Sequence, residues 1–174
     1  MAKSSPDGTI RSFVMFRVTG DKLIPDEITE ILGVFPLLSY RKGEEYQLEN
    51  SGVPIKGKTG VWYFGTDKIV SSTRMSDHIV FLLGILCPEG VLWGDFFPVA
   101  PSTQSGGKKV LIKLGQLQKI LHKQEMKAAV TIFWHGVGGA RPPAIPRVVS
   151  SVFRKIPIEI ETDFEIEEGS RHVA

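Results

Sequence analysis

Cysteine is nearly absent from the chain: Cys87 is the single one among 174 residues. A lone cysteine excludes an internal disulfide and a cysteine-based zinc site, and its place at the end of the apolar stretch LLGILCP is typical of a buried, inert thiol. None of the four histidines pairs at helical spacing with another histidine or with the cysteine. The sequence therefore predicts no metal site and no cofactor.

Long apolar runs and an excess of one charge are lacking as well. No window approaches the roughly 18 apolar residues of a membrane span, and the N-terminal MAKSSPDGTIRSF has no apolar segment of a signal peptide. We therefore expect a cytoplasmic protein without membrane contact. The net charge of +2 argues against a nonspecific nucleic-acid binder, which would show a basic stripe, but it leaves room for a local basic patch at Lys3, Arg11, Arg41 and Lys42.

Apolar residues make up 42% of the sequence, which is enough for a core, and the length fits one domain. We expect a flexible lead-in over residues 1–10, a single domain over 11–166 and a disordered tail over 167–174. The Ser/Gly/Pro-rich segment APSTQSGGKK could instead be a hinge between two halves, 11–100 and 108–166.

The spacing of apolar residues predicts alternating strands and helices. Strands are expected over 12–18, 37–40, 60–64, 128–134 and 156–166, with weaker candidates at 91–99 and at 110–113, the latter equally able to lead into a helix. Helices are expected over 25–32, 76–86, 116–124 and 146–154, with Pro25, Gly33 and Ser76 as end signals. Residues 45–58 have the composition of a surface loop. The fold class is thus α+β, a layered sandwich of a mainly antiparallel sheet with helices on one face, or two ferredoxin-like halves.

The final strand alternates cleanly between apolar and acidic residues. The acidic side consists of Glu159, Glu161, Asp163 and Glu165. This pattern is typical of a half-exposed antiparallel strand near a sheet edge. Such a row is either a solvated face that discourages edge-to-edge pairing, or an acidic docking strip for a cationic protein such as a nuclease.

Two basic segments are further candidates for binding. Arg41, Lys42 and Glu44 lie in a turn that could serve as a recognition surface, although turns use these residue types anyway. The glycine-rich loop at 135–143 could present backbone N–H groups to an anion with Arg141 as charge partner, or be a plain connector. It matches neither the phosphate-loop pattern nor the dinucleotide fingerprint.

Tryptophans are more often core or interface anchors than base-stacking platforms. Trp62 lies in an aromatic strand, and Trp93, if exposed with Phe96 and Phe97, would form a binding patch. Nucleophilic catalysis has little support, because Ser150 and Ser151 fall in a helix and no Gly-x-Ser-x-Gly is present. No catalytic residue is assigned.

Several of these segments together resemble a known family. The strand SFVMFRVTGD, the segment PDEITEILGVFP, then YRKGE, GVWYF and SDHIVFLLGIL are similar to the bacterial domain-of-unknown-function family 4279. The likeness covers residues 11–87 and returns at 129–164, while VLWGDFFPVAPSTQSGG and HGVGGARPP depart from the pattern. The family has no established activity to carry over. The resemblance implies a small bacterial cytosolic protein, of a kind sometimes found near toxin genes as an immunity factor.

Three functional hypotheses follow, of which the first is favoured. It is a non-enzymatic protein-binding domain, in its concrete form an immunity protein that occludes a toxin or other basic partner through the acidic strand and the Trp93 segment. The second is a small-molecule or anion-binding module in which Arg41, Lys42 and Arg141 converge on a phosphate or carboxylate. The third is an enzyme of unrecognised class, which needs a cleft holding a perturbed carboxylate or histidine beside those arginines.

Overall fold

The computed structural model describes residues 8–47, 53–86, 107–145 and 158–167, together with Arg147, Val149, Ser150 and Phe153; for 107–114 it describes the backbone. The larger sheet consists of β1 (Thr9–Gly20), β2 (Leu38–Tyr40), β5 (Gly60–Gly65), β6 (Lys127–Val137) and β7 (Ile158–Glu167). A small hairpin is formed by β3 (Glu45–Tyr46) and β4 (Ile55–Lys56). The helices are α1 (Pro25–Leu32), α2 (Met75–Leu86) and α3 (Gly107–Lys123).

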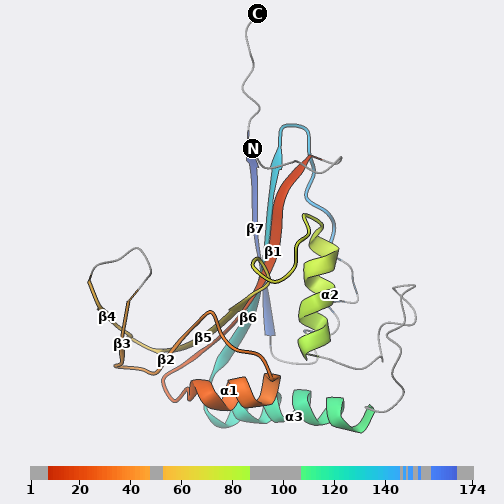
Figure 1. Ribbon diagram of the computed structural model, residues 1–174. Helices are drawn as coiled ribbons and strands as arrows, with labels where there is room; N and C mark the ends of the chain where they lie inside the picture. Colours follow the sequence, from red (N-terminus) through yellow and green to blue (C-terminus); the bar gives the residue numbers. More distant parts are fainter. Residues whose placement is uncertain are drawn as a thin grey trace, which may run out of the picture.

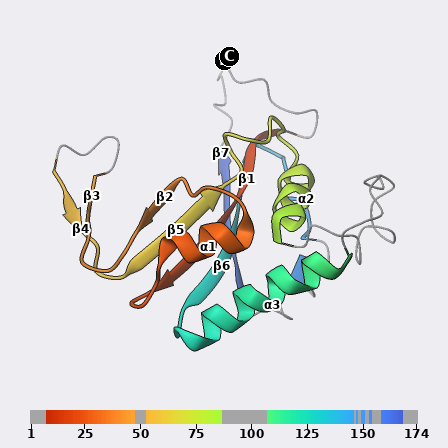
Figure 2. The same cartoon turned by 60° about the horizontal axis from the view of Figure 1, so that its bottom comes forward.

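The five-stranded sheet has the order β2-β5-β1-β6-β7, and every neighbouring pair is antiparallel except β6 with β7. Figures 1 and 2 show α1, α2 and α3 gathered on the same face of this sheet, while the β3-β4 hairpin projects away from it. The structure therefore confirms the predicted α+β sandwich with a mainly antiparallel sheet and helices on one face.

The two segments considered as ferredoxin-like halves contribute strands to this one sheet. β1, β2 and β5 come from the first segment, and β6 and β7 come from the second. β1 lies in the middle; it pairs with β6 from Thr9 to Thr19 and with β5 from Met15 to Gly20. Apart from the small β3-β4 hairpin of the first half, all described strands belong to this one sheet.

The ends of the domain extend further than the sequence predicted. Thr9 and Ile10, assigned to the flexible lead-in, belong to β1, and Glu167, assigned to the disordered tail, ends β7. The Trp134 indole nitrogen donates a hydrogen bond to the Thr9 hydroxyl at 3.1 Å, which fixes the start of β1 on β6. Tertiary contacts thus order a segment whose local composition is that of a loop.

Aromatic residues of the central strands form the middle of the core. Trp62 on β5 is fully buried; its ring lies edge-on to Phe16 at 6.1 Å and beside Phe64 at 6.3 Å. The Trp62 indole nitrogen donates to the Thr29 hydroxyl at 3.0 Å, so β5 is tied to α1 by a buried polar contact as well as by packing. The apolar faces of α1, α2 and α3 complete the same core through Ile28, Leu32, Ile79, Leu82, Leu83, Leu86, Leu117 and Leu121.

The ends of the helices agree with the sequence signals in α1 but not in α2 and α3. α1 has the predicted bounds, with Pro25 in its first turn and Gly33 in the left-handed conformation at φ 71°. α2 begins at Met75, so Ser76 lies inside the first turn and does not cap the helix; its hydroxyl donates instead to Asp77 at 3.3 Å. α3 begins at Gly107, so residues 110–113 lead into a helix and do not form a strand.

The final strand is parallel to its neighbour, where the sequence predicted an antiparallel strand. β7 does lie at the sheet edge, but it pairs with β6 in parallel register from Ala128 with Ile158 to Val137 with Glu167. Between them, Arg147, Val149, Ser150 and Phe153 are helical, and Val149 and Phe153 are buried in the core. Strand, helix and strand therefore form a crossover connection, which returns the chain in the same direction.

Residues 45–58 are more regular than the surface loop expected there. The segment 45–58 was predicted to be an irregular loop, but it contains the β3-β4 hairpin, in which Tyr46 stacks on Tyr40 with 4.0 Å between ring centroids. The strand candidate at 91–99, Cys87 and most of the hinge segment lie outside the described residues.

Candidate functional site

The sheet face opposite the helices, called here the outer face, is not covered by any described helix (Figures 1 and 2). Because strand residues alternate between faces, Phe13, Met15 and Arg17 of β1 point outward while Val14, Phe16 and Val18 enter the core. A near-continuous apolar run such as that of β1 is typical of a strand with both faces covered by other elements. In the structure, Phe13 and Met15 are only half-buried, by neighbouring side chains of the sheet itself.

The four carboxylates singled out from the sequence stand on this outer face. In the register of β6 and β7, Glu159, Glu161, Asp163 and Glu165 lie beside Ala129, Thr131, Phe133 and His135. We call these four carboxylates the acidic strip. β7 has no second neighbour among the described strands, so the strip runs along a free edge of the sheet.

One member of the acidic strip is held by the sheet, and the others are not. Glu161 accepts a hydrogen bond from the Thr131 hydroxyl at 2.8 Å and lies 3.2 Å from the Arg17 guanidinium. Glu159, Asp163 and Glu165 make no side-chain hydrogen bond or ion pair with another described residue. Three negative charges of the strip are therefore left for a partner or for solvent.

An aromatic pair borders the acidic strip. Phe13 of β1 stacks on Phe133 of β6 with 4.4 Å between centroids and 7° between planes, and the Arg11 guanidinium lies 4.6 Å from the Phe13 ring. The Arg11 guanidinium also forms an ion pair with Asp67 at 3.6 Å.

A shallow cleft of about 250 Å³ lies between this aromatic pair and β7. Its lining comes from three neighbouring strands and consists of Arg11, Phe13, Phe133, Trp134, His135, Asp163 and Glu165. His135 Nε2 is 3.4 Å from a Glu167 carboxylate oxygen, without an aligned hydrogen bond. The carboxylates of Asp163 and Glu165 thus lie beside apolar ring surface, and polar residues around apolar and aromatic surface are common at protein interfaces.

The turn at Arg41 to Glu44 is built by its own contacts. The Glu44 carboxylate accepts a hydrogen bond from the Arg41 backbone N–H at 2.7 Å, Gly43 has φ 84°, and the Arg41 guanidinium is 3.9 Å from Asp26. Lys42 forms an ion pair with Asp21. These contacts account for the residue types of the turn without a ligand.

The basic residues proposed to converge on an anion do not meet. Tyr40, which precedes Arg41, is aligned through Val61 with Thr19 at the end of β1. Arg141 follows Ala140, whose N–H bonds to Val137 O, and Val137 lies beside Gly8 before the start of β1. Ten strand residues separate these ends, roughly 33 Å. Trp62 is buried in the core and cannot line a surface site, and Trp93 lies outside the described residues.

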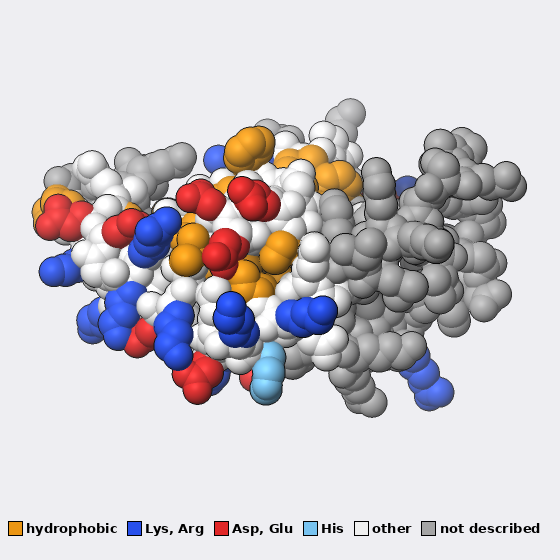
Figure 3. All heavy atoms as spheres, turned by 90° about the horizontal axis from the view of Figure 1, so that it is seen from below, with side chains coloured by type: hydrophobic (Ala, Val, Ile, Leu, Met, Phe, Trp, Pro, Cys, Tyr) orange, Lys and Arg blue, Asp and Glu red, His pale blue; other side chains and the backbone are white. Residues whose placement is uncertain are grey.

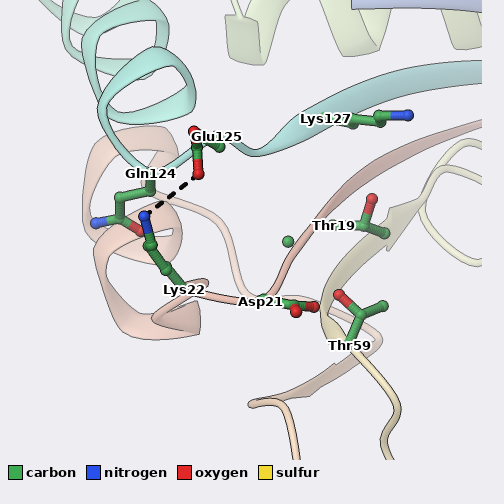
Figure 4. Close-up of a pocket in the computed structure, with 8 residues that line it drawn as sticks. Thr19, Asp21, Lys22, Thr59, Gln124, Glu125 and Lys127 are labelled. Carbon is green, nitrogen blue, oxygen red and sulfur yellow. Dashed lines mark hydrogen bonds and ion pairs between the residues drawn. The ribbon is translucent and has the colours of Figure 1, made fainter.

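A second cavity, of about 320 Å³, lies at the end of β1 near Arg41 and is lined by Thr19, Gly20, Asp21, Lys22, Thr59, Gln124, Glu125 and Lys127. Figure 4 shows the Lys22 ammonium joined to the Glu125 carboxylate, a contact of 3.3 Å, while Lys127 points away from that pair. Hydrogen bonds from Lys42 and Thr59 hold the pKa of Asp21 below its usual range. Lys22 of this cavity is therefore already paired with Glu125, and the cavity also contains the Asp21 carboxylate, which weakens the cavity as an anion site.

Among the described residues, the surface over α1 and the second half of α3 carries charges of both signs (Figure 3). Seen from below in Figure 3, this side of the molecule carries Lys and Arg side chains interspersed with Asp and Glu. Interspersed charges are typical of a solvated surface. The acidic strip differs, since its four members share one sign and one strand.

The acidic strip is evident from the sequence, but the aromatic and histidine residues beside it are not. The sequence placed Phe13 and Phe133 in apolar strands and His135 in a loop. It gave no reason to bring these residues together, because local sequence does not show that β1 and β6 are neighbours. The available signal was a weak alternation in β6, where Thr131, Phe133 and His135 share one side. Only the register of three strands brings these residues beside Asp163 and Glu165.

Two other kinds of site find no support in the described part of the chain. It contains no group of three or more His, Cys, Asp or Glu residues that could hold a metal ion. None of its helices is long and apolar enough to cross a membrane.

Comparison with known proteins places the chain in a family. Curated proteins and solved structures give no match. A family model described as "Domain of unknown function (DUF4279)" matches residues 9–167, from the first residue of β1 to the last residue of β7. The match includes the segment after α2 and the loop after β6, where the resemblance seen in the sequence was weakest. The chain therefore belongs to the DUF4279 family.

Proposed function

We propose that this protein is a non-enzymatic binding domain that engages a cationic protein partner through the acidic strip. The observation that carries the proposal is that Glu159, Asp163 and Glu165 stand unpaired among the described residues, on a sheet face that no described helix covers. Opposite charges steer partners together and select them, and such surface charges act mainly on the rate and specificity of association.

The aromatic border supports the same proposal. Phe13 and Phe133 supply apolar surface next to the carboxylates, and a cationic side chain of a partner could contact both. Binding hot spots commonly combine ring surface with paired charges. In its concrete form, the domain is a bacterial, cytoplasmic immunity protein that covers the basic surface with which a toxin holds phosphates.

The test is recovery of a partner from cells of the native host at low salt, with three versions of the tagged protein. The strip variant carries Glu159→Gln, Asp163→Asn and Glu165→Gln, and keeps Glu161 because Arg17 and Thr131 depend on it. The control variant removes three exposed carboxylates elsewhere, by Asp26→Asn, Glu30→Gln and Glu45→Gln. Both variants change the net charge equally.

We expect a stoichiometric basic protein with the wild type and the control variant, and its loss with the strip variant or at high salt. Equal recovery by the wild type and the strip variant would contradict the proposal. Failure to recover any stoichiometric partner would also count against it.

A further inference from the structure

We infer that the free edge of β7 accepts an added β-strand from the partner, a strand in which basic and apolar residues alternate. The inference rests on the proposed function and specifies its binding mode. β7 is ten residues long and pairs only with β6 among the described strands, so the backbone N–H and C=O groups of its other side form no ladder with the described part of the chain. An extended peptide that pairs with such an edge gains affinity from backbone hydrogen bonds and specificity from alternate side chains.

The two faces of β7 specify the side chains of the added strand. On the outer face, Glu159, Asp163 and Glu165 lack partners among the described residues, and this favours Lys or Arg opposite them. On the inner face, Phe164 is 37% exposed and Ile166 is 53% exposed. Figure 1 shows why: the upper ends of β1, β6 and β7 extend past α2. Apolar residues of an added strand would cover this exposed end.

A second copy of the chain does not fit this edge. Pairing β7 with β7 of another molecule would place carboxylates of both acidic strips on one face of a joint sheet, where like charges across strands are destabilising. The opposite edge of the sheet, β2, is only three residues long and offers little to pair with. The acidic strip therefore disfavours self-association at β7 and favours a cationic strand.

The probe is an eight-residue peptide of alternating Lys and Val, acetylated and amidated at its ends. It is compared with a peptide of the same composition in the order Lys-Lys-Val-Val, repeated, and with the alternating peptide N-methylated at every second residue. Affinity is measured together with amide hydrogen exchange of β7. We expect slower exchange at alternate amides of β7 with the alternating peptide. We expect about tenfold weaker binding of the other two, because the N-methylated peptide loses backbone hydrogen bonds and the reordered peptide puts Lys and Val on both faces of the added strand.

Two protein variants test the contribution of the inner face. Ile166→Ser should weaken binding of the alternating peptide, whereas Ile69→Ser, at a residue 49% exposed elsewhere, should not. Equal, salt-sensitive binding of all three peptides without slower exchange in β7 would overturn strand addition and leave the electrostatic proposal standing. If no cationic peptide binds, and no partner is recovered from the host, both the inference and the proposed function fail.

Discussion

At the scale of single residues, burial and hydrogen bonding decide which aromatic residues belong to the core. Trp62 and Trp134 are both buried, and each indole nitrogen donates to a threonine hydroxyl, Thr29 and Thr9 respectively. The sequence could predict that tryptophans anchor a core, but not that Trp62 is unavailable to a ligand, because that depends on α1 folding over β5.

Thr29→Val tests the contact between Trp62 and α1. Valine has nearly the same shape but leaves the Trp62 N–H without its acceptor, which we expect to lower the free energy of unfolding by about 1–3 kcal/mol. Urea unfolding followed by tryptophan fluorescence measures the loss. Thr162→Val on the exposed part of β7 is the control and should change stability by less than about 0.5 kcal/mol.

Gly136→Ala tests the close packing of β6 at its end. A Cβ at this position would lie 2.4 Å from a Trp134 ring atom, and the buried ring has little room to move. We expect a loss of about 1–3 kcal/mol from overpacking. Gly84→Ala is the matched control, because nothing lies within 4 Å of its added Cβ and alanine favours the helix. A loss as large in Gly84→Ala as in Gly136→Ala would contradict this account.

At the scale of secondary-structure elements, local signals located the helices but not the start of α3, which lies at Gly107 and not at residue 116, and they were insufficient for the pairing of strands. Pro25 and Gly33 mark the ends of α1 as predicted. The parallel pairing of β6 and β7 was missed because an alternating strand is typical of antiparallel sheets, and only the helical residues between them reveal a crossover. The β3-β4 hairpin was missed because each of its strands has two residues, too few to show a period.

The start of α2 predicts a dependence of stability on pH. Burial alone would raise the pKa of Asp77, but hydrogen bonds from Ser72 and Arg74 and the charge of Arg74 outweigh it, so the pKa lies below its usual value of 3.8. A carboxyl whose pKa is lowered by folding stabilises the fold above its unfolded pKa, and this stabilisation is lost as the pH falls through the folded pKa.

Asp77→Asn removes that ionisation. Denaturant midpoints at about pH 6 and about pH 2.5 should differ less in Asp77→Asn than in the wild type, because the asparagine has no charge to lose. Glu30→Gln, an exposed change on α1, should keep the wild-type pH dependence. The same pH dependence in Asp77→Asn and the wild type would show that Asp77 does not stabilise the start of α2.

At the scale of the whole molecule, the fold places unlike surfaces on opposite sides of one sheet. The helices close the inner face, and the outer face leaves a cleft of about 250 Å³ and an acidic edge in contact with solvent. The sequence predicted the α+β class and the acidic strip, because both depend on local alternation. It could not predict the Phe13–Phe133 pair beside the strip, or the wide separation of Arg41 from Arg141, because both depend on strand order.

The central claim is that the acidic strip binds a cationic protein, and the most direct test is the affinity for the partner recovered from the host. The dissociation constants of the wild type, the strip variant and the control variant are measured by titration at low and at high salt. The strip variant loses three charge pairs with the partner, and each surface pair contributes up to about 1 kcal/mol to binding. We therefore expect the strip variant to bind about tenfold or more weakly than the wild type at low salt. The difference should shrink at high salt, and the control should bind like the wild type. Equal dissociation constants for all three proteins at low salt would contradict the claim.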